Sequence, residues 1–290
     1  MPGGKREHYG GGGGDRKRNK RQYLPGRGSG QVHASAKHKT HSVERLRNPG
    51  IKGVLVSCDV RAEALCASEC IMAFTDHAQE RYPAIFEHEE ESEAGSGGVV
   101  DPEKAIAAEA KRAKEDRHFY CVNTGVKGLV FVEFTHETMD PVALCTAIVQ
   151  NVKETGHTKT KYAVRMTPVV AGSYASIEAI CKAVQPVVEQ HLGAALEPTS
   201  YCLVFKKRSN PDIERTKLID KVAELVDKKH KVDLTTPKRA VIIDVLANNC
   251  LIGVMDDYFT LKKCNLQELA GIGIKEAEKL AGGAGDERVK

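Results

Sequence analysis

The stretch that decides the fold runs from Lys231 to Tyr258 and reads KVDLTTPKRAVIIDVLANNCLIGVMDDY. It opens with a polar turn and continues with two apolar runs, RAVIIDVLAN and CLIGVMDDY. The segment VIIDVL is apolar at nearly every position, whereas a strand with one face in water alternates apolar and polar residues. The stretch therefore predicts two strands of a central sheet that is covered on both faces.

The segments before this stretch supply further elements of the same unit. A strand is predicted at YAVRMTPV, and a helix at SIEAICKAVQPVVEQHL, with Ser176 as its N-cap and Pro186 as a point where it kinks or restarts. The strand SYCLVFKKRS ends in three cations and leads into an amphipathic helix expected over residues 214–231. We assign residues 156–265 to this α/β unit.

A first unit is predicted over residues 51–155. The run GVLVSCD indicates a strand, and the helical spacing of apolar residues in AEALCASECIMAFTDHAQERY indicates a helix. FYCVNTG and GLVFVEF have the spacing of a hairpin, and a second helix begins at Pro141. The order strand, helix, strand, strand, helix resembles a ferredoxin-like half-sandwich. An acidic segment, residues 87–118, is expected to be a solvated insertion.

The N-terminal segment, residues 1–50, has a different composition. It carries twelve Lys or Arg against three acids, a net charge of +9, so the rest of a chain with total charge +4 carries −5. It is rich in Gly and poor in branched apolar residues, so it cannot bury enough surface to offset its ordering entropy. We expect a mobile basic arm that binds polyanions. The alternative is a tail that serves only to increase solubility. The cations expected to contact phosphate, or to be read by a nuclear import receptor, are Arg16, Lys17, Arg18, Lys20 and Arg21.

The sequence contains features that bear on the location of the protein in the cell. No run of 18 or more apolar residues occurs, and the N-terminus lacks the apolar stretch of a secretory signal. The nine cysteines are an odd number, scattered and mostly within apolar segments, which favours reduced thiols over a disulfide framework. We expect no membrane association and a nuclear or nucleolar location, with a cytoplasmic pool also compatible with the sequence.

A strand with a basic end, a helix, and then KVDLTTPKRAVIIDVLANNCLIGVM together resemble the closing half of the THUMP domain, an RNA-binding module. The tail DDYFTLKKCNLQEL is similar to that of one subgroup, the adaptors of tRNA cytidine acetylation. The resemblance implies a ferredoxin-like domain followed by an α/β THUMP domain. It also implies a chain that presents serine and leucine tRNAs to a separate RNA cytidine acetyltransferase for N4-acetylcytidine formation. We expect this chain to be monomeric on its own.

The candidate RNA-binding residues of the folded part are cations near strand ends, together with one threonine. Lys238 and Arg239 begin a strand and are expected to share a rim with the cations that end the preceding one. Asp233 is expected to be a turn residue that accepts backbone hydrogen bonds. Arg165 has an alternative role, in which it caps the sheet with a carboxylate partner. The full set outside the arm is Arg165, Lys206, Lys207, Arg208, Lys231, Thr236, Lys238 and Arg239.

Catalytic and cofactor motifs are missing from the sequence. It contains neither GxxxxGK[ST] nor a strand-following GxGxxG, and its histidines have no paired nucleophile at a recognisable spacing. Cys66, Cys70 and His77 provide too few ligands to close a zinc site by themselves. We therefore expect a binding module without enzymatic activity, cofactor or metal.

Two other functions remain open at this point. One is a general RNA-binding or ribosome-assembly factor, and the other is an undetected nuclease or transferase. The C-terminal tail, residues 266–290, contains LQELAGIGIKEAEKLAGGAG, which has the shape of a helix-hairpin-helix element that could hold a phosphate or, alternatively, fray as an amphipathic tail.

Overall fold

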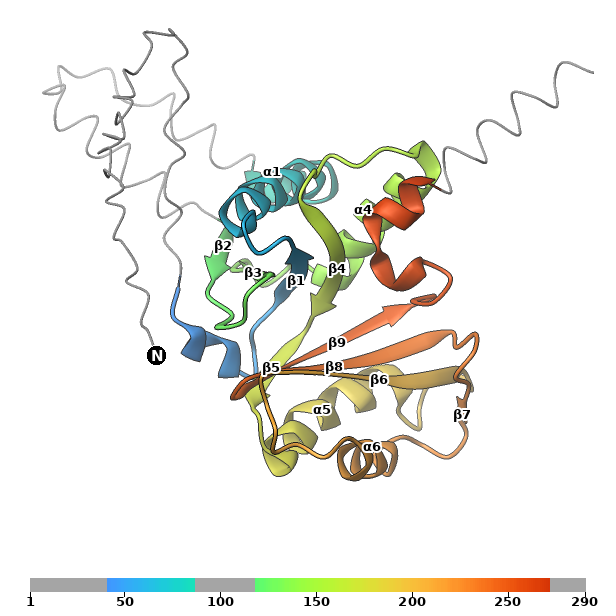
Figure 1. The fold of residues 1–290 in the computed structure, drawn as a ribbon. Coiled ribbons are helices and arrows are strands. Elements are labelled where there is room, and N and C mark those ends of the chain that lie inside the picture. Colours follow the sequence, from blue (N-terminus) through green and yellow to red (C-terminus); the bar gives the residue numbers. More distant parts are fainter. Residues whose placement is uncertain (1–40, 87–117, 272–290) are drawn as a thin grey trace, which may run out of the picture. The chain divides into compact units, whose positions relative to one another are not determined.

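The structure is a computed structural model that describes residues 41–86 and 118–271 (Figure 1). Three expectations lie outside these residues: the arm cations Arg16 to Arg21, the acidic insertion, and the part of the C-terminal element beyond residue 271. Among the described residues, no helix is long and apolar enough to cross a membrane.

The first sheet has four antiparallel strands in the order β2-β3-β1-β4. Its elements follow the sequence β1 (Gly53–Cys58), α1 (Glu63–Arg81), β2 (Phe119–Val122), β3 (Leu129–Phe134), α4 (Pro141–Thr155) and β4 (Ala163–Val169). This is the ferredoxin-like arrangement that the sequence pattern predicted. Helices α1 and α4 pack on the sheet and share one apolar core with it.

The hairpin glycines and the start of helix α4 have the local conformations that the sequence predicted. Gly125 and Gly128 have φ of 71° and 74°, so the β2–β3 hairpin uses the left-handed conformation that glycine tolerates best. Helix α4 begins at Pro141, and its N-cap Asp140 accepts a hydrogen bond of 2.8 Å from the backbone N–H of Val142.

The second sheet has five strands in the order β5-β9-β8-β6-β7. Its elements are β5 (Ala171–Tyr174), α5 (Ile177–Leu192), β6 (Ser200–Arg208), α6 (Arg215–Ala223), β7 (Lys231–Val232), β8 (Arg239–Leu246) and β9 (Asn249–Asp256). Strand β6 pairs in parallel with β7 and β8, whereas β9 is antiparallel to β8 and β5.

Both faces of the second sheet are buried, as the run VIIDVL predicted. Val241, Ile243 and Val245 belong to the core formed with α5 and α6, which lie on one side of the sheet in Figure 1. Ala240 and Ile242 face the other way, into the core that contains α4 and residues 261–269. Because successive side chains of a strand point to opposite faces, a strand between two cores is apolar at nearly every position.

The strand Ala163–Val169, expected to open the second unit, instead completes the first sheet by pairing with β1. It then continues through Val170 directly into β5 of the second sheet. The backbones also meet where β9 crosses β4: a Cβ on Gly253 would lie 2.0 Å from the carbonyl oxygen of Pro168. The boundary between the two sheets thus lies at Val170, between the end of β4 and the start of β5.

Other boundaries also differ from the expected ones. Residues 43–47 form a short 3-10 helix, η1, inside the segment expected to be a mobile arm, because Leu46 is fully buried and Arg45 pairs with Glu133. Residues 266–271 are helical, and Leu266 and Leu269 are fully buried, so the tail begins as part of the fold.

The two helices of the second unit lie close to the positions expected from the sequence. Helix α6 ends at Ala223 and does not reach residue 231, since the chain turns to bury Val226 and His230. Helix α5 runs through Pro186 as one element from its N-cap Ser176, whose hydroxyl accepts a hydrogen bond from the N–H of Ala179. Packing of the apolar face decides both outcomes over local propensity.

Candidate nucleic-acid interface

The predicted RNA-binding residues of the second sheet lie at two opposite ends of it. Strands β6 and β8 are parallel, with Tyr201 beside Arg239 and Lys206 beside Asp244. Arg239 therefore stands at the start of both strands, whereas Lys206 to Arg208 stand at their end, about 16 Å further along at 3.3 Å per residue. The expectation that these cations share a rim is wrong, because parallel strands place like ends together.

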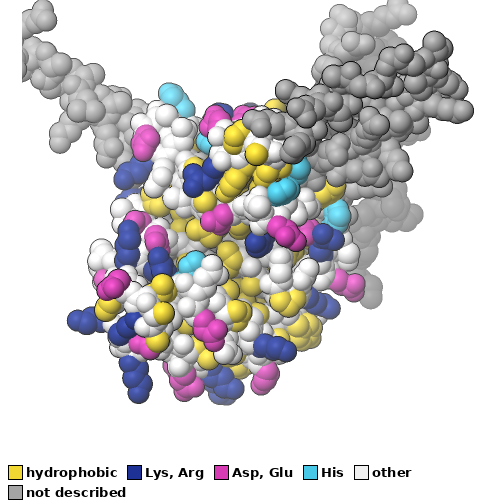
Figure 2. All heavy atoms as spheres, turned by 180° about the vertical axis from the view of Figure 1, so that it is seen from behind, with side chains coloured by type: hydrophobic (Ala, Val, Ile, Leu, Met, Phe, Trp, Pro, Cys, Tyr) yellow, Lys and Arg dark blue, Asp and Glu magenta, His cyan; other side chains and the backbone are white. Residues whose placement is uncertain are grey.

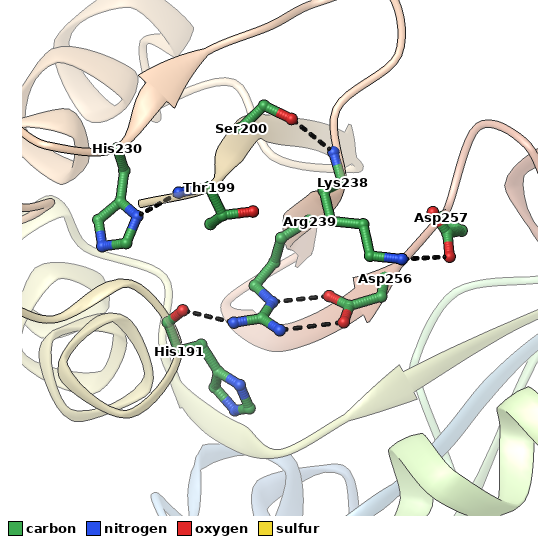
Figure 3. A network of polar contacts seen from close by, with 8 residues as sticks. All are labelled: His191, Thr199, Ser200, His230, Lys238, Arg239, Asp256 and Asp257. Atoms are coloured by element: carbon green, nitrogen blue, oxygen red, sulfur yellow. Dashed lines mark hydrogen bonds and ion pairs between the residues drawn. The ribbon is translucent and has the colours of Figure 1, made fainter. Parts of the chain in front are cut away.

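At the start of β8, the two cations are held by carboxylates (Figure 3). The guanidinium of Arg239 donates to both carboxylate oxygens of Asp256, at 2.6 and 3.0 Å, and to the carbonyl oxygen of His191, at 2.6 Å. The ammonium of Lys238 lies 2.7 Å from a carboxylate oxygen of Asp257. Arg239 thus ties β8, β9 and the end of α5 together.

The polar turn before β8 is organised by Asp233. Its carboxylate accepts hydrogen bonds from the backbone N–H groups of Thr235, at 2.8 Å, and Thr236, at 3.0 Å. The N–H of Thr236, followed by that of Thr235, lowers the pKa of this carboxyl group. The hydroxyl of Thr236 also lies 3.3 Å from Asp233, and Lys231 is exposed on the short edge strand β7. Asp233 is therefore the turn residue that its sequence predicted.

The Arg239–Asp256 pair should make stability depend on pH in a defined direction. Burial pushes the pKa of Asp256 upward, but the hydrogen bonds and charge of Arg239 outweigh burial, so the pKa of Asp256 lies below its ordinary value. A depressed folded-state pKa stabilises above the unfolded value, about 3.9, and this contribution is lost as the pH falls through the folded value.

We expect Asp256→Asn to lower the free energy of unfolding by about 1 kcal/mol at pH 7, a figure that allows for solvent screening of this half-exposed pair. Denaturant titrations of both proteins from pH 7 to pH 2.5 check it. The difference should hold steady down to about pH 4 and shrink below that pH. Asp212→Asn, at an exposed aspartate, is the control. A difference that stays constant throughout the range contradicts the pairing.

At the other end of β6, four cations gather around a pocket of about 380 Å³ that is lined by residues of both sheets. We call it the basic pocket. Leu55, Ser57 and Leu129 of the first sheet form part of its wall. The cations come from β4, from β6 and from the turn after β9, and they are Arg165, Lys206, Arg208 and Lys263.

Lys207 does not belong to this pocket. Successive side chains of β6 point to opposite faces, so Lys206 and Arg208 share one face and Lys207 points to the other. The ammonium of Lys207 donates to the carbonyl oxygen of Ile213 at 2.9 Å. Arg165 lines the pocket and also has a carboxylate partner, Glu268, at 3.7 Å, as its alternative role requires.

Lys263 was not among the residues expected from the sequence. It lies in a turn where Lys262, Lys263 and Cys264 have φ of 51°, 55° and 57°, a left-handed conformation that is costly for residues other than glycine. Cys264 anchors the turn, since it is fully buried and its sulfur lies 3.0 Å from that of Met255. The sequence LKKC carries no signal for such a turn.

Lys206 is the most enclosed of the four cations. Burial lowers the pKa of its ammonium group, whereas the charge of Asp244 acts to raise it. The ammonium lies 5.7 Å from the ring centroid of Tyr258. A partly desolvated cation gains more from an arriving anion than one in open water, because solvent screens the interaction less.

The basic pocket is suited to a phosphate group. Four cations converge there on a framework of two sheets, and the acids near them are Asp244 and Glu268. On the face shown in Figure 2, by contrast, basic and acidic side chains are interspersed. A concentration of cations at one place binds polyanions more strongly than the same charges mixed with acids.

Comparison with known proteins identifies the relatives of this chain. Residues 174–255 match the model of the THUMP domain. The chain is 30% identical to a THUMP domain-containing protein 1 homolog of Drosophila melanogaster, over 86% of this chain and 82% of the relative. It is 25% identical to the tRNA acetyltransferase TAN1 of Saccharomyces cerevisiae, over 77% of this chain and 86% of that protein.

Among solved structures, one match is a 4-thiouridine synthetase in complex with RNA and ATP. The sequence identity is 14%, the TM-score is 0.34, and the match covers 72% of this chain and 42% of the other. The extent of the match to the Drosophila protein decides the family. The chain belongs to the family of THUMP domain-containing protein 1.

Proposed function

We propose that this chain is an adaptor that binds tRNA and presents it to a separate RNA cytidine acetyltransferase, which forms N4-acetylcytidine. The observation that carries the proposal is the basic pocket, where four cations stand at the junction of the two sheets. The THUMP domain and the name of the yeast relative support tRNA as the RNA and acetylation as the reaction. Serine and leucine tRNAs are the expected substrates, because the resemblance to the adaptor subgroup implies them.

The name of the yeast relative also raises a second possibility, in which the chain itself transfers the acetyl group. Two buried cysteines of the core beside the basic pocket, Cys202 and Cys264, offer no thiolate for a covalent acetyl-enzyme route. Burial raises the pKa of Cys202 to about 11 and that of Cys264 to about 12. Both thiols are therefore un-ionised near neutral pH, and the thiolate is the form that acts as a nucleophile. An adaptor acts instead by raising the effective concentration of tRNA at the enzyme and fixing its orientation.

A reconstituted reaction tests the proposal. Purified chain, RNA cytidine acetyltransferase, tRNA, ATP and acetyl-CoA are combined, each component is omitted in turn, and acetylcytidine is measured by mass spectrometry. We expect the complete mixture alone to form product at a high rate, with a loss of at least tenfold when the chain is omitted. Product from the chain without the acetyltransferase would show that it is the enzyme.

A parallel purification from cells addresses the remaining alternative, a general ribosome-assembly factor. Recovery of the acetyltransferase and tRNA with the tagged chain supports the adaptor. Recovery of ribosomal proteins and rRNA without either of them rejects it. The Lys217→Ala variant, altered at an exposed residue of α6, serves as the control for tagging and folding.

A further inference from the structure

Two buried polar atoms of the basic pocket have no hydrogen-bond partner among the described residues. They are Oδ1 of Asp244 and the hydroxyl oxygen of Tyr258. Both residues line the pocket, although Asp244 is only 2% exposed and Tyr258 only 1%. A buried polar group without a partner costs about 1–3 kcal/mol, so two of them in one pocket indicate a ligand that completes their hydrogen bonds.

Asp244 is the unexpected member of the pair. It interrupts the apolar run VIIDVL in β8 and stands beside Lys206 of β6 in the parallel register. Burial raises the pKa of Asp244, and the charges of Lys206 and Arg208 act in the opposite direction. A site for phosphate alone gains nothing from a carboxylate, which repels the anion. The charge of Asp244 helps to keep the buried Lys206 protonated. Its unpartnered Oδ1 has a further use if the ligand also brings a hydrogen-bond donor.

The pocket favours a sugar hydroxyl over a stacked base as the source of this hydrogen-bond donor. The ring of Tyr258 is almost fully buried, with Lys206 over it, and Lys263 lies over the ring of Phe259 at 5.3 Å. The buried ring of Tyr258 therefore offers no open face on which a base could stack, and a cation already lies over the ring of Phe259. A sugar hydroxyl needs no such platform, and in RNA the 2′-hydroxyl is close to phosphate and can both donate and accept.

We propose that Asp244, with Tyr258, accepts the 2′-hydroxyl of a ribonucleotide whose phosphate the four cations hold, so that the basic pocket distinguishes RNA from DNA. Asp244 supplies the acceptor for the hydroxyl proton, and the hydroxyl of Tyr258 can donate to the same sugar oxygen. This inference rests on the proposed RNA binding and adds its specificity-determining residue.

The first test uses wild-type protein and Asp244→Ala with a tRNA transcript and its DNA copy. Removing a negative charge from a cationic pocket should raise affinity for any polyanion, and we expect the DNA to bind about two- to threefold more tightly. Because a hydrogen bond to a charged acceptor is lost, we expect the transcript to bind about tenfold more weakly. Opposite changes for the two nucleic acids are the expected result. Equal increases for both would show that Asp244 only moderates the electrostatic field.

Asp244→Asn provides the matched control. It keeps one acceptor oxygen in the same place and removes the charge, so the preference for RNA should survive. If Asp244→Ala does not fold, as judged by its melting temperature, the wild-type protein is titrated with transcripts that carry one 2′-deoxy substitution each. One or two neighbouring positions should account for most of the loss, and a loss spread evenly along the RNA overturns the inference.

The failure of this inference differs from the failure of the proposed function. Wild-type protein that binds neither transcript nor DNA contradicts the RNA-binding function. Wild-type protein that binds both with equal affinity keeps a nucleic-acid site and rejects the role of Asp244.

Discussion

Gly253→Ala is expected to lower the free energy of unfolding by about 3 kcal/mol, a large share of the stability of a typical domain. The added Cβ would lie 2.0 Å from the carbonyl oxygen of Pro168 and 3.2 Å from its carbon. Both contacts are to backbone atoms, so no side chain can rotate away, and β9 must separate from β4. Equilibrium unfolding in urea, followed by circular dichroism, measures the change.

Gly271→Ala is the matched control, because it adds the same methyl group where nothing lies within 4 Å. Gly271 is exposed and helical, and alanine in a helix is favoured over glycine by about 0.5–1 kcal/mol. The two substitutions should therefore change stability in opposite directions. If Gly253→Ala costs no more than 0.5 kcal/mol, the two sheets do not approach as closely as described.

Replacing Lys206, Lys263 and Arg208 together with alanine is expected to weaken tRNA binding by at least 100-fold at 50 mM salt. Each phosphate contact contributes about 0.7 to 0.9 to the slope of log affinity against log salt, so three contacts should flatten the slope by about 2.1 to 2.7. Filter binding at four salt concentrations gives both quantities. The result applies to the proposed RNA-binding function directly.

The control removes the same charge from another place. Lys217, Lys221 and Lys228 are exposed on or just after α6, on the far side of the second sheet from the basic pocket. Their replacement by alanine should change the slope by less than one. Equal losses from both triple variants would mean that RNA responds to the net charge of the chain and not to the pocket.

The sequence predicted which elements are buried more accurately than it predicted which elements they pair with. VIIDVL revealed a strand with two covered faces because hydrophobicity reports removal from water, whatever the partner is. The five-element pattern before residue 155 indicated the ferredoxin-like unit, although its last strand was assigned to the wrong sheet. A complete unit of this type requires a final strand after its second helix, so that signal was present.

The errors at the site have similar physical origins. A strand, helix and strand such as β6, α6 and β8 form a parallel crossover, which places Lys238 and Arg239 away from the end of β6. The period of two along a strand likewise separates Lys207 from its neighbours. Both facts could have been derived from the sequence. Lys263 could not, because three successive left-handed residues depend on the burial of Cys264 and not on local propensity.

The position of β5 has a consequence for biosynthesis. Strand β5 is made early and is bonded only to β9, which is the last strand of its sheet to be made. A chain emerging from the ribosome can complete the first sheet once Val169 is available, and β6 can pair with β8 once Leu246 is made, but β5 must wait for its partner until Asp256 has been added, and until then β8 also keeps one edge unpaired. Such non-local pairing folds slowly and leaves apolar edges open in the meantime. The second half of the nascent chain is therefore the part that most needs protection by chaperones.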